Sequence, residues 1–205
     1  MYVSDKKALD DFIGDYKLNR KDGISVVSTM DLSQLKSVGY NAEDLFNHLS
    51  EHYRSFLHGS RTYFDSPIRP SKLSKEKSKV FGSNYATFLT HFGSIALLKA
   101  ILSNRGSNLG YSMHLNDVPL KVKIKDINEN TIGKEGYVYL VNNSEGFVNG
   151  LNFESNKKQK MIDSRNWIEH VKIGSEPVSY NAVVSVVKTD FTYPIFDVTN
   201  NKRIQ

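Results

Sequence analysis

Short strand-like segments separated by turns fill the C-terminal half of the chain. Around Val122 and Ile124, apolar residues alternate with lysines, which is the pattern of a strand with one buried face. The strands predicted in this way cover residues 111–115, 118–124, 137–141, 167–173, 178–187 and 193–198. No helical pattern alternates with these strands, so parallel βαβ units are not expected. We expect the strands to pair antiparallel instead.

Helical patterns come earlier in the chain. A short helix is predicted from a cap at Ser4 to a stop at Gly14. Asn41 and Asp44 approximate a capping box and predict a second helix, in which apolar residues share one face. A third helix is predicted over about residues 85–103. Helices followed by a run of strands predict an α+β fold.

Composition narrows the class of protein. The chain has 205 residues and no cysteine, which excludes disulfide scaffolds, thiolate zinc sites and cysteine nucleophiles. Charged residues spread through the first fifteen positions leave no apolar core for a signal peptide. The longest uncharged run, residues 80–98, is too polar to span a membrane. We therefore expect a cytoplasmic protein with no membrane partner.

Positive charge is concentrated after residue 55. The chain has a net charge of +5, which divides into −2 over residues 1–55 and +7 over residues 56–205. A basic body suits an anionic ligand such as a nucleotide, a dinucleotide or a nucleic acid backbone. A merely soluble basic surface is an equally common explanation.

Several common motifs are absent. The sequence has no G-x-x-x-x-G-K-[ST] phosphate loop, no G-x-G-x-x-G turn and no H-E-x-x-H zinc motif. His48 and His52 form its one i, i+4 histidine pair. On an otherwise amphipathic helix, this pair is expected to be structural, and no metal site is predicted.

Three separated segments carry the strongest functional pattern. The first, residues 56–60, ends in His58-Gly59-Ser60. The second is a predicted short strand at residues 79–82 that contains Phe81, and the third, residues 167–173, contains Glu169. Together they resemble the ADP-ribosyltransferase superfamily, in the His-Tyr-Glu branch of diphtheria toxin and the poly(ADP-ribose) polymerase catalytic domains.

The resemblance covers about residues 55–190 and implies a fold as well as an activity. The implied fold is a pair of split antiparallel β-sheets with flanking helices, in a domain over residues 55–205. Residues 1–54 would form a small helical N-terminal extension. The implied activity is transfer of ADP-ribose from NAD, the co-substrate, to an acceptor.

The resemblance also assigns roles to residues. Glu169 would hydrogen-bond the nicotinamide ribose and orient the acceptor, and His58 would hydrogen-bond a ribose hydroxyl. The backbone of Gly59 would hold the nicotinamide amide. Phe81 stands where the family places a stacking tyrosine, and Tyr85 is the substitute four residues on. The complete set of implied NAD-binding residues is His58, Gly59, Ser60, Phe81, Tyr85 and Arg69.

Alternatives remain for both the site and the function. Glu176 is the rival carboxylate, and His58, Phe81 and Glu169 also have ordinary structural explanations. Trp167 stands where arginine-modifying relatives carry a second Glu or Gln, so a protein, nucleic acid or small-molecule acceptor other than arginine is expected. An inactive member that binds NAD or a nucleotide, or a basic α+β nucleic-acid-binding module, would explain the same charge.

Overall fold

The computed structural model describes residues 6–15, 32–65, 67–102, 111–113, 122–125, 127, 131–143, 145–149 and 169–204. Its helices are α1 (Lys6–Asp15), α2 (Ser33–Ser37), α3 (Ala42–Tyr53), α4 (Lys75–Phe81) and α5 (Gly93–Ile101), with a 3-10 turn η2 (Lys188–Asp190). The first strands are β1 (Phe56–Ser60), β2 (Ser71–Lys72), β3 (Tyr85–Thr90), β4 (Tyr111–Met113), β5 (Val122–Ile124) and β6 (Glu135–Val141). The later strands are β7 (Val148–Asn149), β8 (Glu169–Ile173), β9 (Ala182–Val187), β10 (Ile195–Asp197) and β11 (Lys202–Arg203).

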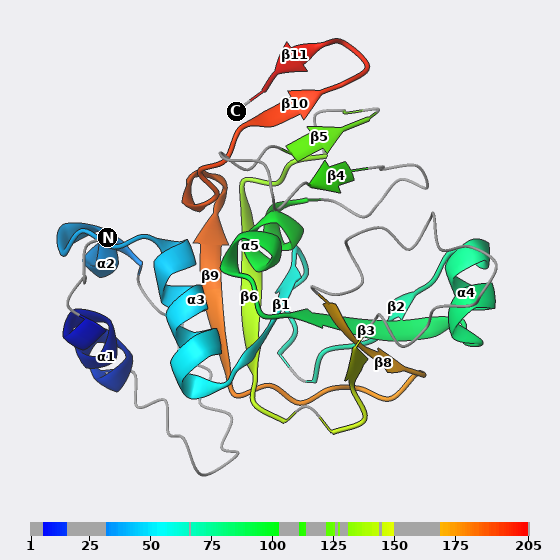
Figure 1. The fold of residues 1–205 in the computed structure, drawn as a ribbon, viewed down its shortest axis with the longest axis horizontal. Coiled ribbons are helices and arrows are strands. Elements are labelled where there is room, and N and C mark those ends of the chain that lie inside the picture. Colours follow the sequence, from blue (N-terminus) through cyan, green and yellow to red (C-terminus); the bar gives the residue numbers. More distant parts are fainter. Residues whose placement is uncertain are drawn as a thin grey trace.

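The strands form two sheets (Figure 1). The larger has the order β7-β8-β3-β1-β6-β9, with β2 paired to β3, and all its pairs are antiparallel. The smaller has the order β11-β10-β5-β4 and contains one parallel pair, β10 with β5. The α+β class is thus confirmed, and the expected antiparallel pairing holds except at that one pair.

The larger sheet divides where β1 meets β3. These two strands share a single register pair, Leu57 with Thr90. On either side of that pair, β1 runs along β6 and β3 runs along β8, each over five register pairs. In Figure 1, β3 crosses the view while β1, β6 and β9 stand upright. The sheet therefore consists of two halves that are joined by a single register pair, at a place that we call the fork.

Helix α5 packs directly against the upright half of the sheet. A Cβ atom at Gly59 would overlap the carbonyl oxygen of Ala96, and one at Gly136 would overlap that of Ala100. The two missing side chains allow the helix backbone to approach the strands closely. Helices α1 and α3 add apolar side chains to the same buried cluster, so the N-terminal helices share one core with the sheet.

The capping box of α3 is confirmed. The Asn41 side chain accepts from the Asp44 backbone N–H at 3.0 Å, and the Asp44 carboxylate accepts from the Asn41 N–H at 2.9 Å. These bonds satisfy two of the donors that a helix start leaves free. The predicted apolar face is confirmed too, since Leu45, Phe46 and Leu49 are buried.

Several of the predicted elements were wrong or incomplete, and the predicted strand over residues 178–187 begins only at Ala182. The predicted helix over residues 85–103 is a strand, β3, followed by the shorter helix α5. Both faces of β3 are largely covered, so its residues do not show the alternation of a half-exposed strand. The predicted strand at residues 79–82 is the end of α4, which stops at Gly82 in the left-handed conformation (φ 63°). Helix α1 continues one residue beyond the predicted stop at Gly14.

Some of the sequence-based expectations concern residues that the structure does not describe. The Ser4 cap and residue Trp167 lie outside the described residues. Among the residues that the structure does describe, no helix combines the length and the apolar character needed to cross a membrane.

Candidate functional site

His58 lies at the fork. Its Nδ1 donates a hydrogen bond to the backbone carbonyl of Phe88 at 2.9 Å, so the imidazole bridges β1 and β3 just beyond the last ladder pair. Since a carbonyl oxygen only accepts, the proton sits on Nδ1, and Nε2 keeps its lone pair. Burial lowers the pKa of His58 to about 4, a shift that the Phe88 bond opposes and the nearby Lys99 charge reinforces. The ring is therefore neutral at pH 7 and offers an acceptor.

A short segment, residues 62–64, is tied down beside His58. The Tyr139 hydroxyl accepts from the Phe64 N–H at 2.7 Å and donates to the Thr62 carbonyl at 3.0 Å. The Tyr180 hydroxyl donates to the Phe64 carbonyl at 2.6 Å. The His58 ring centroid lies 6.5 Å from that of Phe64 and 6.1 Å from that of Tyr139. Two tyrosine hydroxyls thus fix the chain that leaves β1 over the imidazole.

Gly59 and Ser60 continue β1 along β6 only. Their register partners are Val138 and Tyr137, and no ladder pair links them to β3. A strand with a neighbour on one side leaves every second residue's N–H and C=O directed away from that neighbour. Such backbone groups could hold a planar amide. The missing side chain of Gly59 has a separate, structural explanation, because α5 occupies the space a Cβ would need.

The two candidate stacking residues have different surroundings. Phe81 belongs to α4 and packs against a small buried cluster, with its ring centroid 6.1 Å from that of Phe88. Tyr85 begins β3, lies opposite Lys72 of β2 and is 40% exposed. Tyr85 therefore has the accessible ring, whereas Phe81 has the contacts of a core residue. Arg69, another of the implied NAD-binding residues, is exposed beside the short bridge of Ile68 to Val178.

The register places Glu169 in the same sheet as His58. Glu169 lies opposite Thr90, and Thr90 lies opposite Leu57, so the position of Glu169 is in the row of Leu57 and not in that of His58, the next residue along β1. Only one strand, β3, separates the two segments, which are more than a hundred residues apart in sequence. The rival Glu176 is an exposed residue whose carboxylate lies 3.2 Å from the Lys172 ammonium. That contact gives Glu176 an ordinary surface role.

Sequence reasoning missed a cluster of rings next to Glu169. The ring centroids of Phe56, His91 and His170 lie between 4.4 and 4.9 Å from one another. His91 Nδ1 is 3.1 Å from the Ser50 hydroxyl, and His170 Nδ1 is buried with no hydrogen-bond partner in the described part of the chain. Burial lowers the pKa of both histidines. The position of His170 next to Glu169 was the one sequence signal.

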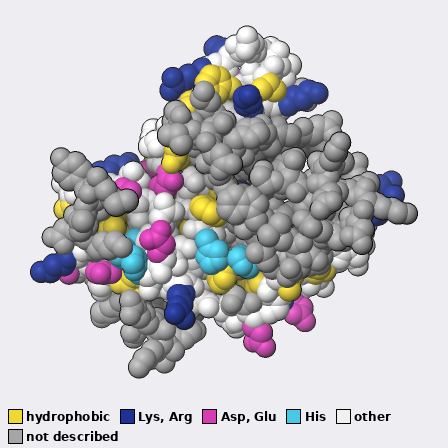
Figure 2. All heavy atoms as spheres, viewed as in Figure 1, with side chains coloured by type: hydrophobic (Ala, Val, Ile, Leu, Met, Phe, Trp, Pro, Cys, Tyr) yellow, Lys and Arg dark blue, Asp and Glu magenta, His cyan; other side chains and the backbone are white. Residues whose placement is uncertain are grey.

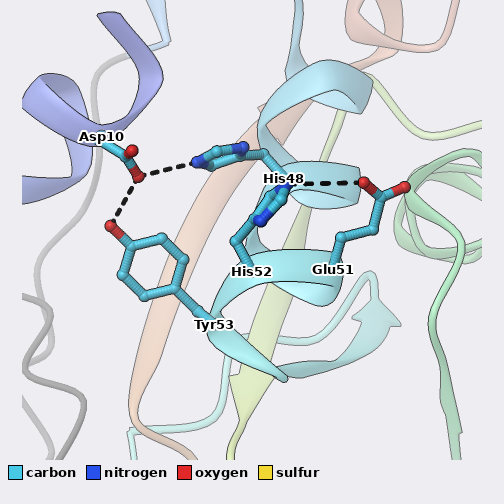
Figure 3. Close-up of polar contacts among 5 residues, drawn as sticks. All are labelled: Asp10, His48, Glu51, His52 and Tyr53. Atoms are coloured by element: carbon cyan, nitrogen blue, oxygen red, sulfur yellow. Dashed lines mark hydrogen bonds and ion pairs between the residues drawn. The ribbon is translucent and has the colours of Figure 1, made fainter. Parts of the chain in front are cut away.

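Of the pair His48 and His52, His48 links helix α3 to helix α1. His48 Nε2 lies 2.9 Å from Asp10 Oδ1, and the Tyr53 hydroxyl donates to the same oxygen at 2.9 Å (Figure 3). His52 instead faces Glu51 at 3.8 Å. The hydrogen bond from His48, with that from Tyr53, lowers the pKa of Asp10 against the effect of burial. Within the described ranges, no three His, Cys, Asp or Glu residues are grouped to hold a metal ion.

Comparison with known proteins identifies no relative of this chain. No family model matches the chain, and neither a curated protein nor a solved structure does.

Proposed function

We propose that the chain is an ADP-ribosyltransferase that takes NAD as its co-substrate. The observation that supports this most is the fork in the larger sheet, where a half-buried neutral histidine joins two diverging strands. Beyond it, Gly59 and Ser60 have a strand neighbour on one side only. The imidazole can accept a hydrogen bond from a hydroxyl, and the backbone N–H and C=O groups of Gly59 and Ser60 can pair with a carboxamide. This combination suits a ligand that carries both kinds of group.

The chemistry assigns a role to each group. Cleavage of the nicotinamide–ribose bond leaves the electron pair on the departing nicotinamide and an oxocarbenium-like ribose. In the proposal, the Glu169 carboxylate stabilises that positive charge and takes the proton of the attacking acceptor. His58 Nε2 accepts from a ribose hydroxyl, while its Nδ1–H stays with the Phe88 carbonyl.

Tyr85 takes the stacking role in this proposal. Its ring is accessible, and an aromatic face can cover the nicotinamide at low entropic cost. Phe81 packs in a cluster with Leu73, Ala86 and Val171, so its removal would damage the fold rather than remove a ligand-binding group.

The proposal does not specify the acceptor, which is a protein, a nucleic acid or a small molecule. The cytoplasm is the proposed compartment, because a chain without cysteines needs no oxidising one.

The test measures nicotinamide release and label transfer from adenylate-labelled NAD in a cell lysate. Wild type is compared with Glu169→Gln and His58→Asn, and with Glu176→Gln as a matched surface control. We expect Glu169→Gln to lose about a hundredfold or more in rate, as removal of one transition-state interaction does. Glu176→Gln should keep the wild-type rate. Wild-type rates in Glu169→Gln would refute the assignment.

Thermal stabilisation separates a transferase from a binding protein. With NAD at about 100 times its dissociation constant, folding should gain roughly 2.7 kcal/mol. Stabilisation without nicotinamide release would identify a protein that binds NAD but does not transfer ADP-ribose. No stabilisation at any NAD concentration, together with no release, would reject both.

A further inference from the structure

The smaller sheet has one apolar face and one basic face. Val122, Ile124 and Ile195 are fully buried and belong to the main hydrophobic core. Lys123, between Val122 and Ile124, is exposed, and Phe196, which follows Ile195, is half-buried. Because successive strand residues point to opposite sides, Lys123 and Phe196 lie on the face turned away from the core.

The strand register gathers cations around Phe196. Lys123 of β5 and Arg203 of β11 are its partners on the two neighbouring strands. Lys125 follows two positions after Lys123 and is also exposed. We call these four residues, Lys123, Lys125, Phe196 and Arg203, the basic face. The backbone of Phe196 thus lies one strand spacing, about 5 Å, from the backbone of a cationic residue on each side.

The acidic group of this sheet is turned inward. Asp197 is the one acidic residue among the described positions 111–113, 122–125 and 195–204, and it is 6% exposed. Its carboxylate accepts from the Thr199 N–H at 2.9 Å and from the Asn200 side chain at 2.6 Å. At the top of the view in Figure 2, dark blue lysine and arginine side chains surround yellow hydrophobic ones. Lys123 and Lys125 therefore have no acidic residue beside them among the described positions of this sheet.

We infer that the basic face binds single-stranded nucleic acid. Lysine and arginine would contact successive phosphates, and the Phe196 ring would stack on an unpaired base. A duplex keeps its base faces stacked inside the helix, so the ring favours a single strand. This inference is independent of the proposed ADP-ribosyl transfer, because the basic face and His58 belong to different sheets.

The test is fluorescence anisotropy with labelled twelve-nucleotide oligouridylate and oligothymidylate, without NAD and over a range of salt. We expect Lys123→Ala/Lys125→Ala to weaken binding and to reduce the slope of log K against log salt by about 1.4, or about 0.7 for each phosphate that is no longer neutralised. The charge-matched control is Lys75→Ala/Lys79→Ala on α4, where both of these lysines are exposed. It should keep the wild-type slope.

Phe196 tests the stacking step separately. We expect Phe196→Leu to bind roughly ten- to a hundredfold more weakly, and Phe196→Trp to restore affinity. Leucine keeps an apolar side chain at the position, and circular dichroism checks that each variant is folded. No oligonucleotide binding by wild type at low salt would overturn the inference. So would equal losses in both lysine pairs, or binding to duplex or to anionic phosphatidylserine vesicles as tight as to the single strand.

Discussion

At the scale of single residues, His58 combines a structural and a proposed functional role. Its imidazole supplies the Phe88 carbonyl with a donor at the point where strand pairing ends. A buried carbonyl without a donor would cost free energy, so the ring stabilises the fork. The same bond fixes which ring nitrogen remains an acceptor. The hydrogen bond to Phe88 therefore fixes both the position of the His58 ring and its tautomer.

The lowered pKa of His58 predicts how stability depends on pH. The unfolded chain takes up this proton near pH 6.5, whereas folded His58 resists it down to about 4. Between these values the unfolded state binds more protons, so the free energy of unfolding falls as pH falls from 6.5 to 4. For this group the full loss is about 3 kcal/mol. Urea unfolding at pH 7 and pH 4.5 should show a smaller pH effect in His58→Asn than in wild type.

Other titrating groups remain in both proteins, so the comparison isolates His58. His91 and His170 also have pKa values lowered by burial, and they contribute equally to wild type and variant. Equal pH effects in the two proteins would contradict the neutral state of His58.

Predictability at this scale depends on sequence distance. The Asn41 and Asp44 cap was predicted correctly because it joins residues three apart. The bond from His58 to Phe88 joins residues thirty apart and exists only through the register of two strands. The Phe56, His91 and His170 cluster depends on three separate strand ends in the same way. Such contacts have no local sequence signal.

At the scale of elements, β3 and α4 explain the main errors. β3 has neighbours on both edges and cover on both faces, so its apolar residues run on instead of alternating. The apolar residues of β3 continue almost without interruption into those of α5, so the sequence pattern predicts one long helix over both elements. The ends of α4 were present in the sequence, since Ser74 caps its start and Gly82 follows its end. The strand predicted at residues 79–82 covers only the last turn of this helix and the glycine after it.

The contact of α5 with the sheet predicts opposite effects for two glycine substitutions. Gly136→Ala would place a methyl group against the Ala100 carbonyl, so we expect a loss of roughly 1–3 kcal/mol or more in the free energy of unfolding. Gly14→Ala lies inside α1 with open space around it. It should instead stabilise by about 0.5–1 kcal/mol, because alanine favours the helix. Chemical denaturation measures both, and equal effects would contradict the close approach of α5.

At the scale of the whole molecule, the N-terminal helices and the sheet share one core. Ile13 of α1, Leu45 of α3 and Val184 of β9 belong to the same buried cluster. The bonds of His48 and Tyr53 to Asp10 add polar links between α1 and α3. The sequence predicted helices in this region, but it offered no sign that they complete the core of the strands.

A shared core predicts cooperative unfolding of α1 with the sheet. Ile13 is 1% exposed, so Ile13→Ala should cost about 2–5 kcal/mol in the free energy of unfolding. The surface neighbour Asp11 is the control on the same helix, and Asp11→Ala should change stability by less than about 0.5 kcal/mol. Calorimetry should show one transition that shifts as a whole in Ile13→Ala. A separate early transition, with the main one unchanged, would mean that the extension folds independently of the sheet.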